Sequence, residues 1–345
     1  MSDSSFRLVY TSDRYDLGYE VGALSELTDI DVELVTGVVE TPDELIALAK
    51  NADALVVSSR EAVPRVVFEQ LEKCQVITRM SVGIDHVDLE AATDHGVVVS
   101  HCPDYCTDEV ADHAMALILT LNRRVVETNE DLHKGAWVDR SYHTQQILRG
   151  PMPPLRELTL GIVGFGRIGR SVGRRAKPFG LRIVVSDPYV DPAVAAEAGV
   201  ELVSLDELAA QSDIITLHCP LTDETRGMID SAFFDKVKPT AVLVNTARGG
   251  IVDMNAIAAA LTDGRLAAAG LDVVVPEPLP SDSPLYSLPN VILTPHDAYY
   301  SERSRVQVRV DTLNAALSVL RGMYPRTVAN PAVIEKLALR PWAPS

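Results

Sequence analysis

The amino-acid sequence predicts an α/β protein built from two doubly wound parallel sheets. Short runs rich in Val, Ile and Leu alternate with segments of helical composition along most of the chain, which is typical of this class. The alternation pauses after residue 101 and restarts at residue 158, so two sheets are expected. The length of 345 residues, about twice that of a usual domain, agrees with two domains.

The first hundred residues contain enough candidate strands for one small sheet. These strands are Phe6–Thr11, Asp31–Val35, Ala54–Ser58, Val76–Met80 and Val97–His101. The later part of the chain predicts a second, larger sheet. Its strands are Leu158–Val163, Arg182–Ser186, Glu201–Val203, Ile214–His218, Val242–Asn245, Ala267–Asp272 and Val291–Thr294.

Residues 107–124 lie between the two groups of strands and predict a buried connecting helix. Thr107 is expected to cap this helix, whose first turn carries two acidic residues. The apolar positions that fall on one face are Val110, Ala114, Leu117, Ile118 and Leu121. We interpret His113 as a packed or interface histidine rather than a metal ligand. A rigid loop at Gly150–Pro154 then leads to the next strand.

Composition and charge argue against several classes of function. With 31 basic and 48 acidic residues the net charge is −17, the wrong sign for a nucleic-acid binder. Four cysteines without a CxxC pair predict neither a disulfide scaffold nor a zinc site. No signal-peptide pattern and no membrane-length apolar run is present, so a cytoplasmic protein is expected. Only seven basic residues are lysines, which fits either a salt-rich cytoplasm or an arginine-rich codon usage.

A glycine-rich fingerprint follows the strand that ends at Val163. It fits G-x-G-x-x-G and consists of Gly164, Phe165, Gly166, Arg167, Ile168 and Gly169. The first glycine permits a tight turn, the second admits a pyrophosphate, and the third lets helix and strand pack closely. Asp187 ends the next strand, where its carboxylate accepts hydrogen bonds from a ribose and repels a 2′-phosphate. The pattern predicts NAD rather than NADP; the alternative is a βα turn without a ligand.

Three further polar residues follow later strands. Arg248 comes after the strand at Val242–Asn245, at a strand end where open α/β sheets bind ligands, and arginine can hold a carboxylate by two parallel hydrogen bonds. Glu277 and His296 together predict a general acid/base, a histidine backed by a carboxylate. Taken singly, each residue has another interpretation: Arg248 in a surface ion pair, Glu277 in a proline-rich loop and His296 in a turn. Together, downstream of the fingerprint, they predict a catalytic set.

The sequence resembles the D-isomer-specific 2-hydroxyacid dehydrogenase family over nearly the whole chain. The motifs that carry the resemblance are SVGIDHVDL at 81–89, YCTDEVADHA at 105–114, GFGRIG at 164–169, HCPLTDETRGMI at 218–229, LVNTARGGIVD at 243–253, LDVVVPEP at 271–278 and TPH at 294–296. Within the family it is most similar to the C-terminal-binding-protein-like branch, because of YCTDEVAD, SDPY at 186–189 and LHC at 217–219. Tyr299 stands where that branch typically has tryptophan.

The resemblance implies reversible hydride transfer between NADH and a 2-oxo acid, with a D-2-hydroxy acid as the reduced product. It implies that Arg248 clamps the substrate, that His296 donates the proton and that Glu277 orients His296. The backbone of Ser81, Val82 and Gly83 would bind the substrate carboxylate, and Tyr299 would shape the pocket. The implied NAD contacts are Thr107, Gly164, Phe165, Gly166, Arg167, Ile168, Gly169, Asp187, Cys219, Pro220, Thr225, Thr246, Ala247, Arg248, Asp272 and His296.

The resemblance also implies the division into domains. A Rossmann NAD-binding domain would span 103–297, and a smaller flavodoxin-like substrate domain would combine 1–102 with 298–345, with a cleft between them. A homodimer without a resident metal is implied, with a small 2-oxo or 2-hydroxy acid as partner and neither nucleic acid nor membrane. Because about fifty residues follow His296, no appended regulatory domain is expected.

Two alternatives remain open at this point. One is an NAD(H)-sensing scaffold or corepressor-like binding protein, and the other is a phosphite- or phosphoglycerate-type dehydrogenase of the same family. Glu277 argues against formate oxidation, because formate dehydrogenases usually have glutamine there. Arg60 and Arg79, near the ends of strands in the first domain, fit either a second contact to an anion or surface ion pairs.

Overall fold

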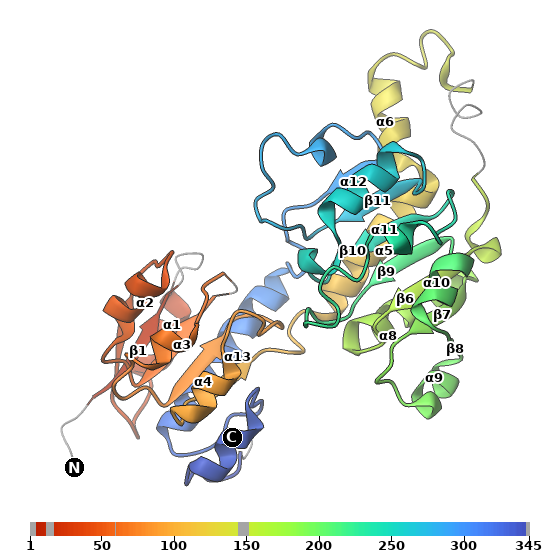
Figure 1. The fold of residues 1–345 in the computed structure, drawn as a ribbon. Coiled ribbons are helices and arrows are strands. Elements are labelled where there is room, and N and C mark those ends of the chain that lie inside the picture. Colours follow the sequence, from red (N-terminus) through yellow and green to blue (C-terminus); the bar gives the residue numbers. More distant parts are fainter. Residues whose placement is uncertain (1–4, 12–16, 59, 144–151, 343–345) are drawn as a thin grey trace. The chain divides into compact units, whose positions relative to one another are not determined.

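The computed structural model describes residues 5–11, 17–58, 60–143 and 152–342. The chain divides into two compact units, each built around one parallel sheet (Figure 1). Unit 1 comprises Met1–Tyr105 with Ser301–Ser345, and unit 2 comprises Cys106–Tyr300. The predicted boundaries at residues 102 and 297 fall just before the observed ones. Two parallel α/β sheets confirm the predicted fold class.

Unit 1 contains a five-stranded sheet in the order β2-β1-β3-β4-β5, with every neighbouring pair parallel. This is the strand order of flavodoxin-type doubly wound sheets. The strands are β1 (Phe6–Tyr10), β2 (Val32–Thr36), β3 (Ala54–Val57), β4 (Val76–Arg79) and β5 (Val98–His101). All five were predicted, with ends that differ by at most one residue. Apolar runs predict such strands well because both faces of the sheet are covered.

The helices of unit 1 come from both ends of the chain. They are α1 (Gly18–Ser25), α2 (Pro42–Ala49), α3 (Arg65–Phe68), α4 (Leu89–Asp94), α13 (Glu302–Leu320) and the 3₁₀ helix η5 (Pro331–Lys336). Helix α13 packs against β3, β4 and β5, and in Figure 1 it lies along these strands. The Asn330 side chain, which is buried, then bonds the backbone of Val97 and Val99. These contacts explain why the C-terminal segment belongs to this unit.

Unit 2 contains a seven-stranded parallel sheet in the order β12-β11-β10-β9-β6-β7-β8. The strands are β6 (Thr159–Val163), β7 (Arg182–Ser186), β8 (Glu201–Leu202), β9 (Ile214–Leu217), β10 (Val242–Asn245), β11 (Ala268–Leu271) and β12 (Val291–Leu293). All seven were predicted to within one residue at either end. The chain runs outward from β6 in both directions, so the order reverses between β6 and β9.

The helices of unit 2 cover both faces of its sheet. They are α5 (Thr107–Arg123), α6 (Val125–His133), η1 (Leu155–Glu157), α8 (Arg167–Ala176), η2 (Lys177–Phe179), α9 (Pro192–Ala198), α10 (Leu205–Gln211), α11 (Ser231–Phe234), η3 (Gly249–Ile251), α12 (Met254–Thr262) and η4 (Pro284–Tyr286). Among the described residues, no helix combines the length and the hydropathy needed to cross a membrane.

The connecting helix α5 buries the predicted apolar face. Val110, Ala114, Leu117 and Ile118 are buried, and the helix packs against α8, β10 and β11. The predicted cap is wrong: Cys106 occupies the N-cap position without a side-chain hydrogen bond, and Thr107 is the first helical residue. The helix therefore begins one residue before the position that the threonine indicated. Residues 150 and 151 of the predicted Gly150–Pro154 loop lie outside the described residues.

Candidate active site

The predicted site residues of unit 2 lie at one edge of its sheet. Six of them follow the carboxyl ends of six adjacent parallel strands, β12, β11, β10, β9, β6 and β7. In that order along the edge they are His296, Asp272, Thr246, Cys219, Gly164 and Asp187. Ligands of open α/β sheets bind at this edge, where the strand order reverses, and Gly164 and Cys219 flank the reversal.

The three glycines of the fingerprint have distinct structural roles. Gly164 has a φ of +87°, and a Cβ there would lie 2.6 Å from the backbone N of Cys219. A Cβ on Gly169 would lie 2.1 Å from the Gly164 carbonyl oxygen, so the helix packs tightly on the preceding turn. A Cβ on Gly166, by contrast, meets open space. The turn, the close packing and the open approach are the features that a pyrophosphate site requires.

Helix α8 begins beside this open space. Gly166 is its N-cap residue, and no described side chain caps the helix. Its first backbone N–H groups can therefore bind an anion, helped by the helix dipole. Farther along the sheet edge, the Thr246 hydroxyl oxygen is buried without a hydrogen-bond partner among the described residues. An open helix N-terminus and an unpartnered buried hydroxyl fit a bound dinucleotide.

Asp187 directly follows β7 and is the residue predicted to bind the ribose. Its carboxylate accepts hydrogen bonds from the backbone N–H groups of Phe165 at 2.7 Å and Tyr189 at 2.9 Å. The Tyr189 hydroxyl donates to Glu224 at 2.7 Å. This hydrogen bond, the charge of Glu224 and the charge of Asp187 raise the pKa of Tyr189. The carboxylates of Asp187 and Glu224 therefore both bond Tyr189.

We expect Asp187→Asn to raise NADPH use relative to NADH, because removing a carboxylate weakens repulsion of the 2′-phosphate. The ratio of kcat/KM for NADPH to that for NADH should rise about tenfold, which corresponds to about 1.4 kcal/mol. Steady-state kinetics with both cofactors measure this ratio. Glu224→Gln should move it in the same direction. An unchanged ratio in Asp187→Asn would show that this carboxylate does not select the cofactor.

His218 and Cys219 form an uncharged wall beside Gly164. The His218 Nε2 atom lies 2.9 Å from the Thr216 hydroxyl, and its Nδ1 atom is buried without a partner among the described residues. Burial lowers the pKa of His218 to about 3 and raises the pKa of the Cys219 thiol to about 12. Both side chains are therefore neutral at physiological pH.

The lowered pKa of His218 predicts a specific acid sensitivity. Between its ordinary pKa of 6.5 and about 3, the unfolded chain binds a proton that the folded chain does not. Stability therefore falls as pH falls through that window. His218→Gln should lose less stability than the parent between pH 7 and pH 4.5 in urea unfolding, because glutamine does not titrate. Parallel losses in the two proteins would contradict this role of His218.

Glu277 and His296 form a close pair. The Nδ1 atom of His296 lies 2.8 Å from one carboxylate oxygen of Glu277, and the other oxygen accepts the backbone N–H of Val274 at 3.1 Å. Burial raises the pKa of Glu277, but the hydrogen bond and charge of His296, the Val274 N–H and the charge of Arg248 together lower it below its ordinary value. Glu277 is therefore an anion at neutral pH. Both side chains stay about 40% exposed to solvent.

The loop that follows β10, residues 246–249 (the Arg248 loop), packs against Val274 in the segment that leads to Glu277. A Cβ on Gly249 would lie 2.0 Å from the Val274 carbonyl oxygen, so only glycine permits this approach. Asn245, which is fully buried, holds the loop by accepting from Ala247 N–H at 3.0 Å and donating to the Arg248 carbonyl at 2.9 Å. The three predicted catalytic residues are thus brought together. Sequence reasoning missed Asn245, although asparagine at a strand end commonly bonds nearby backbone.

Asp272 organises the turn that contains His296. It is 3% exposed, and its carboxylate accepts the Thr294 hydroxyl at 2.6 Å and the backbone N–H groups of Asp297 at 3.0 Å and Ala298 at 3.1 Å. Tyr299, half-buried, follows this turn directly. Sequence reasoning named Asp272 as a cofactor contact and missed its hydrogen bonds to the turn.

The remaining predicted residues lie in two places. In unit 2, the Thr225 hydroxyl donates to the Pro220 carbonyl at 2.6 Å, so these two lie in one turn after β9. Ser81, Val82 and Gly83 belong to unit 1. There the Ser81 hydroxyl donates to the Gly83 carbonyl at 2.7 Å, and the Val82 carbonyl lies 2.8 Å from His101 Nδ1.

Arg79 does not lie at the surface, where one of its two interpretations placed it. Its side chain is fully buried within unit 1, at 1% exposure, and donates to the Glu61 carbonyl at 2.8 Å. Arg60, in contrast, is exposed. Of these two arginines, Arg60 presents a solvent-facing cation near the end of β3.

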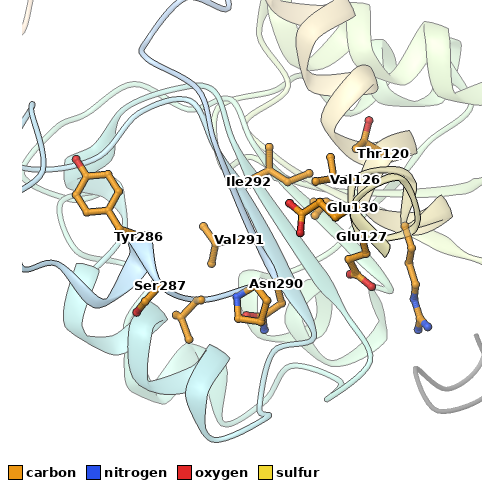
Figure 2. Close-up of a pocket in the computed structure, with 13 residues that line it drawn as sticks. Thr120, Val126, Glu127, Glu130, Tyr286, Ser287, Asn290, Val291 and Ile292 are labelled. Atoms are coloured by element: carbon orange, nitrogen blue, oxygen red, sulfur yellow. The ribbon is translucent and has the colours of Figure 1, made fainter. Parts of the chain in front are cut away.

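A groove in unit 2 lies away from this edge (Figure 2). Its volume is about 230 Å³, and it is bounded by Thr120, Leu121, Arg124, Val126, Glu127, Glu130 and Tyr286–Ile292. Figure 2 shows Glu127 and Glu130 of α6 on one side and the chain that enters β12 on the other. The groove thus lies near the amino end of β12, whereas His296 follows its carboxyl end. Its position and its carboxylates do not suit an anionic substrate.

Comparison with known proteins identifies the family to which the chain is similar. Residues 115–298 match the model of the D-isomer specific 2-hydroxyacid dehydrogenase, NAD binding domain. D-3-phosphoglycerate dehydrogenase of Methanocaldococcus jannaschii is 41% identical over 87% of this chain and 55% of its own length. The chain thus spans about half the length of that relative. Glyoxylate reductase of Korarchaeum cryptofilum is 39% identical over 84% of this chain and 86% of its own length.

Solved structures agree as well. The structure of D-lactate dehydrogenase from Aquifex aeolicus complexed with NAD and lactic acid has a TM-score of 0.79 and 28% identity, and the match covers 98% of this chain and 100% of that one. The matched family model describes an NAD-binding domain, which confirms the predicted cofactor. The predicted resemblance is confirmed at the level of the family: the chain belongs to the D-isomer specific 2-hydroxyacid dehydrogenase family.

Proposed function

We propose that this protein is an NAD-dependent D-2-hydroxyacid dehydrogenase that reduces a 2-oxo acid reversibly, with His296 as the acid/base. The observation that carries the proposal is the 2.8 Å contact between His296 Nδ1 and Glu277, beside the Arg248 loop and along the edge that begins at the fingerprint. A histidine paired through Nδ1 with a carboxylate keeps Nε2 for the substrate.

The roles of the chain's own residues follow from this geometry. Arg248 binds the substrate carboxylate and stands beside the Glu277 carboxylate. Glu277 fixes the His296 ring through Nδ1, so that Nε2 can donate a proton to the carbonyl oxygen. Bound NADH supplies the hydride that reduces the carbonyl carbon, and in oxidation NAD⁺ accepts it. His296 is neutral after reduction and takes a proton from solvent before the next turnover.

The cofactor is assigned to the edge from Gly164 to His296. The N-terminus of α8 would hold the pyrophosphate, Asp187 the ribose, and Thr246 with Ala247 would lie at the nicotinamide end. Thr225, Pro220 and Cys219 would border the adenosine half. Within unit 1, the backbone of Ser81, Val82 and Gly83 stays a predicted substrate contact. In unit 2, Tyr299 would limit the size of the substrate.

Incubation with NADH and a panel of 2-oxo acids tests the proposal. The panel includes pyruvate and glyoxylate, and chiral chromatography identifies the enantiomer formed where the product has a stereocentre. NADH loss with one D-hydroxy acid formed per NADH is the expected result. Tight NADH binding without turnover of any panel member would favour the NAD(H)-sensing scaffold. A pull-down that depends on NADH but not on His296 would support that alternative.

A phosphoglycerate-type substrate is the second candidate function. It is favoured by the D-3-phosphoglycerate dehydrogenase relatives, one of which is 41% identical over 87% of this chain. A second anionic group needs a second cation, and Arg60 is a candidate because its side chain is exposed. Oxidation of 3-phosphoglycerate with NAD⁺ that Arg60→Gln abolishes would favour this candidate. The C-terminal-binding-protein-like branch stays a prediction, since the relatives described above are named otherwise.

We also propose a homodimer. Large apolar side chains are exposed on α6 and the turn after it, with Trp137 at 68% and Val138 at 90% exposure. Such patches mark surfaces that bind another protein. Light scattering should give twice the 37.4 kDa mass of the chain, and Trp137→Ser should reduce it to the monomer.

A further inference from the structure

A chain of hydrogen bonds ties the turn that contains His296 to helix α5. The Nε2 atom of His113 lies 3.0 Å from the Thr294 hydroxyl oxygen, and that oxygen lies 2.6 Å from a carboxylate oxygen of Asp272. His113 belongs to α5, while Asp272 and Thr294 follow β11 and β12. Three elements of unit 2 therefore meet at this turn.

The hydrogen count assigns the direction of these bonds. Thr294 has a single hydroxyl hydrogen and donates it to the Asp272 carboxylate, which can only accept. The Thr294 oxygen then has only lone pairs for His113. The His113 Nε2 atom must therefore carry a hydrogen and donate it. The order of donation runs from His113 through Thr294 to Asp272.

Asp272 and Thr294 in turn hold the backbone of His296. The His296 N–H donates to the Asp272 carbonyl at 2.9 Å and approaches the Thr294 carbonyl at 3.0 Å. His296 has a φ of +57°, a left-handed conformation that is uncommon for residues other than glycine. Such a backbone persists only where its surroundings determine it strongly. The bonds from Asp272 to Asp297 and Ala298 fix the other side of the turn.

We propose that His113 is a positioning residue that, through Thr294 and Asp272, keeps the His296 ring aligned on Glu277. This role rests on the proposed function of His296 as the acid/base. His113 Nε2 lies 3.8 Å from Asp272, and His113, Asp272 and Asp297 could in principle ligate a cation. A metal would need the lone pair of Nε2, however, and the donor assignment removes it.

Two matched pairs of variants test this role. Thr294→Val removes the hydroxyl and Thr294→Ser keeps it; His113→Met removes the donor and His113→Gln keeps an amide N–H. Displacement of a catalytic group by about 1 Å can cost about 10² in rate, so Thr294→Val and His113→Met should lower kcat about tenfold or more. Thr294→Ser and His113→Gln should stay within about threefold of the parent, and NADH affinity should stay within about twofold in all four.

Histidine-selective NMR of the protein without substrate or cofactor supplies a readout that does not depend on turnover. The His296 ring resonances, assigned with His296→Asn, should move toward those of an exposed histidine in Thr294→Val and His113→Met only. If Thr294→Val leaves kcat and these resonances unchanged, the positioning role is wrong. Equal losses of kcat and NADH binding in all four variants would also overturn it, in favour of general packing. If the parent itself has no turnover, the proposed function fails and the NMR comparison alone decides the role.

Discussion

Replacing His296 with Asn is expected to lower kcat for 2-oxo acid reduction by a factor on the order of 10² or more. Asparagine can still hydrogen-bond Glu277, but it cannot deliver a proton to the carbonyl oxygen. The fingerprint and Asp187 follow β6 and β7, which lie four and five strands away from β12 in the sheet, so NADH binding should change little. Stopped-flow absorbance measures the rate, and fluorescence titration measures NADH affinity.

Glu277→Gln is the matched control for this substitution. It keeps the proton donor and removes the carboxylate that fixes it, so it should lower kcat less than His296→Asn does. A His296→Asn variant with the rate of the parent would remove this residue from the reaction. A variant that fails to bind NADH would instead point to a damaged fold, which circular dichroism would detect.

Arg248→Lys is expected to lower kcat/KM for the 2-oxo acid about 10- to 100-fold, because lysine keeps the charge but loses one of two parallel hydrogen bonds. A hydrogen bond to a charged group contributes about 1.5–3 kcal/mol, which corresponds to that range. Steady-state kinetics with varied 2-oxo acid measure the loss. NADH affinity should be retained, because the predicted cofactor contacts also include residues that follow five other strands.

Arg248→Met supplies the second step of this series. It removes the charge as well and should lower kcat/KM further than Arg248→Lys. It should also raise the pKa of Glu277, since the charge of Arg248 helps to lower it. If lysine serves as well as arginine, a two-point contact between Arg248 and the substrate is wrong.

The sequence predicts most of the sheet framework for a simple physical reason. Strands such as Ile214–Leu217 and Val242–Asn245 are buried on both faces, so they are continuous apolar runs. Glycines are equally informative where geometry permits nothing else, as at Gly164 and Gly169. Because all neighbouring strands are parallel, residues that follow them gather at one edge, and the fingerprint and the catalytic set could be placed together from sequence order alone.

The supporting contacts could not be predicted in this way. His113 and Thr294 are 181 residues apart, and their hydrogen bond depends on how α5 packs on the sheet. The pair Tyr189 and Glu224 likewise joins two loops that no local pattern connects. The error at Thr107 is different: threonine favours a cap, but Cys106 occupies the N-cap position and Thr107 is already the first helical residue. Helix caps and hydrogen bonds between distant side chains depend on how the helices and loops pack on the sheet. The periodicity of apolar residues does not encode this packing.

The net negative charge of the chain contrasts with the positive groups at the proposed site. A net charge of −17 repels anions at long range, yet the proposed substrate and cofactor are both anionic. The groups proposed to attract them are Arg248, His296 and the N-terminus of α8, all at the same edge of the sheet. We interpret the acidic excess as a property of the surface outside this edge.

A single-turnover reaction tests the central claim most directly. The complex of the protein with NADH is mixed with a saturating 2-oxo acid that the panel identifies, and NADH absorbance is followed for the parent and for His296→Asn. The proposed roles predict the loss of one NADH per active site in the parent. In the variant, the rate of this loss should be lower by a factor on the order of 10² or more, with NADH bound in both proteins. Equal rates in the two proteins, or a parent that holds NADH and never oxidises it, would contradict the assignment of His296 as the acid/base.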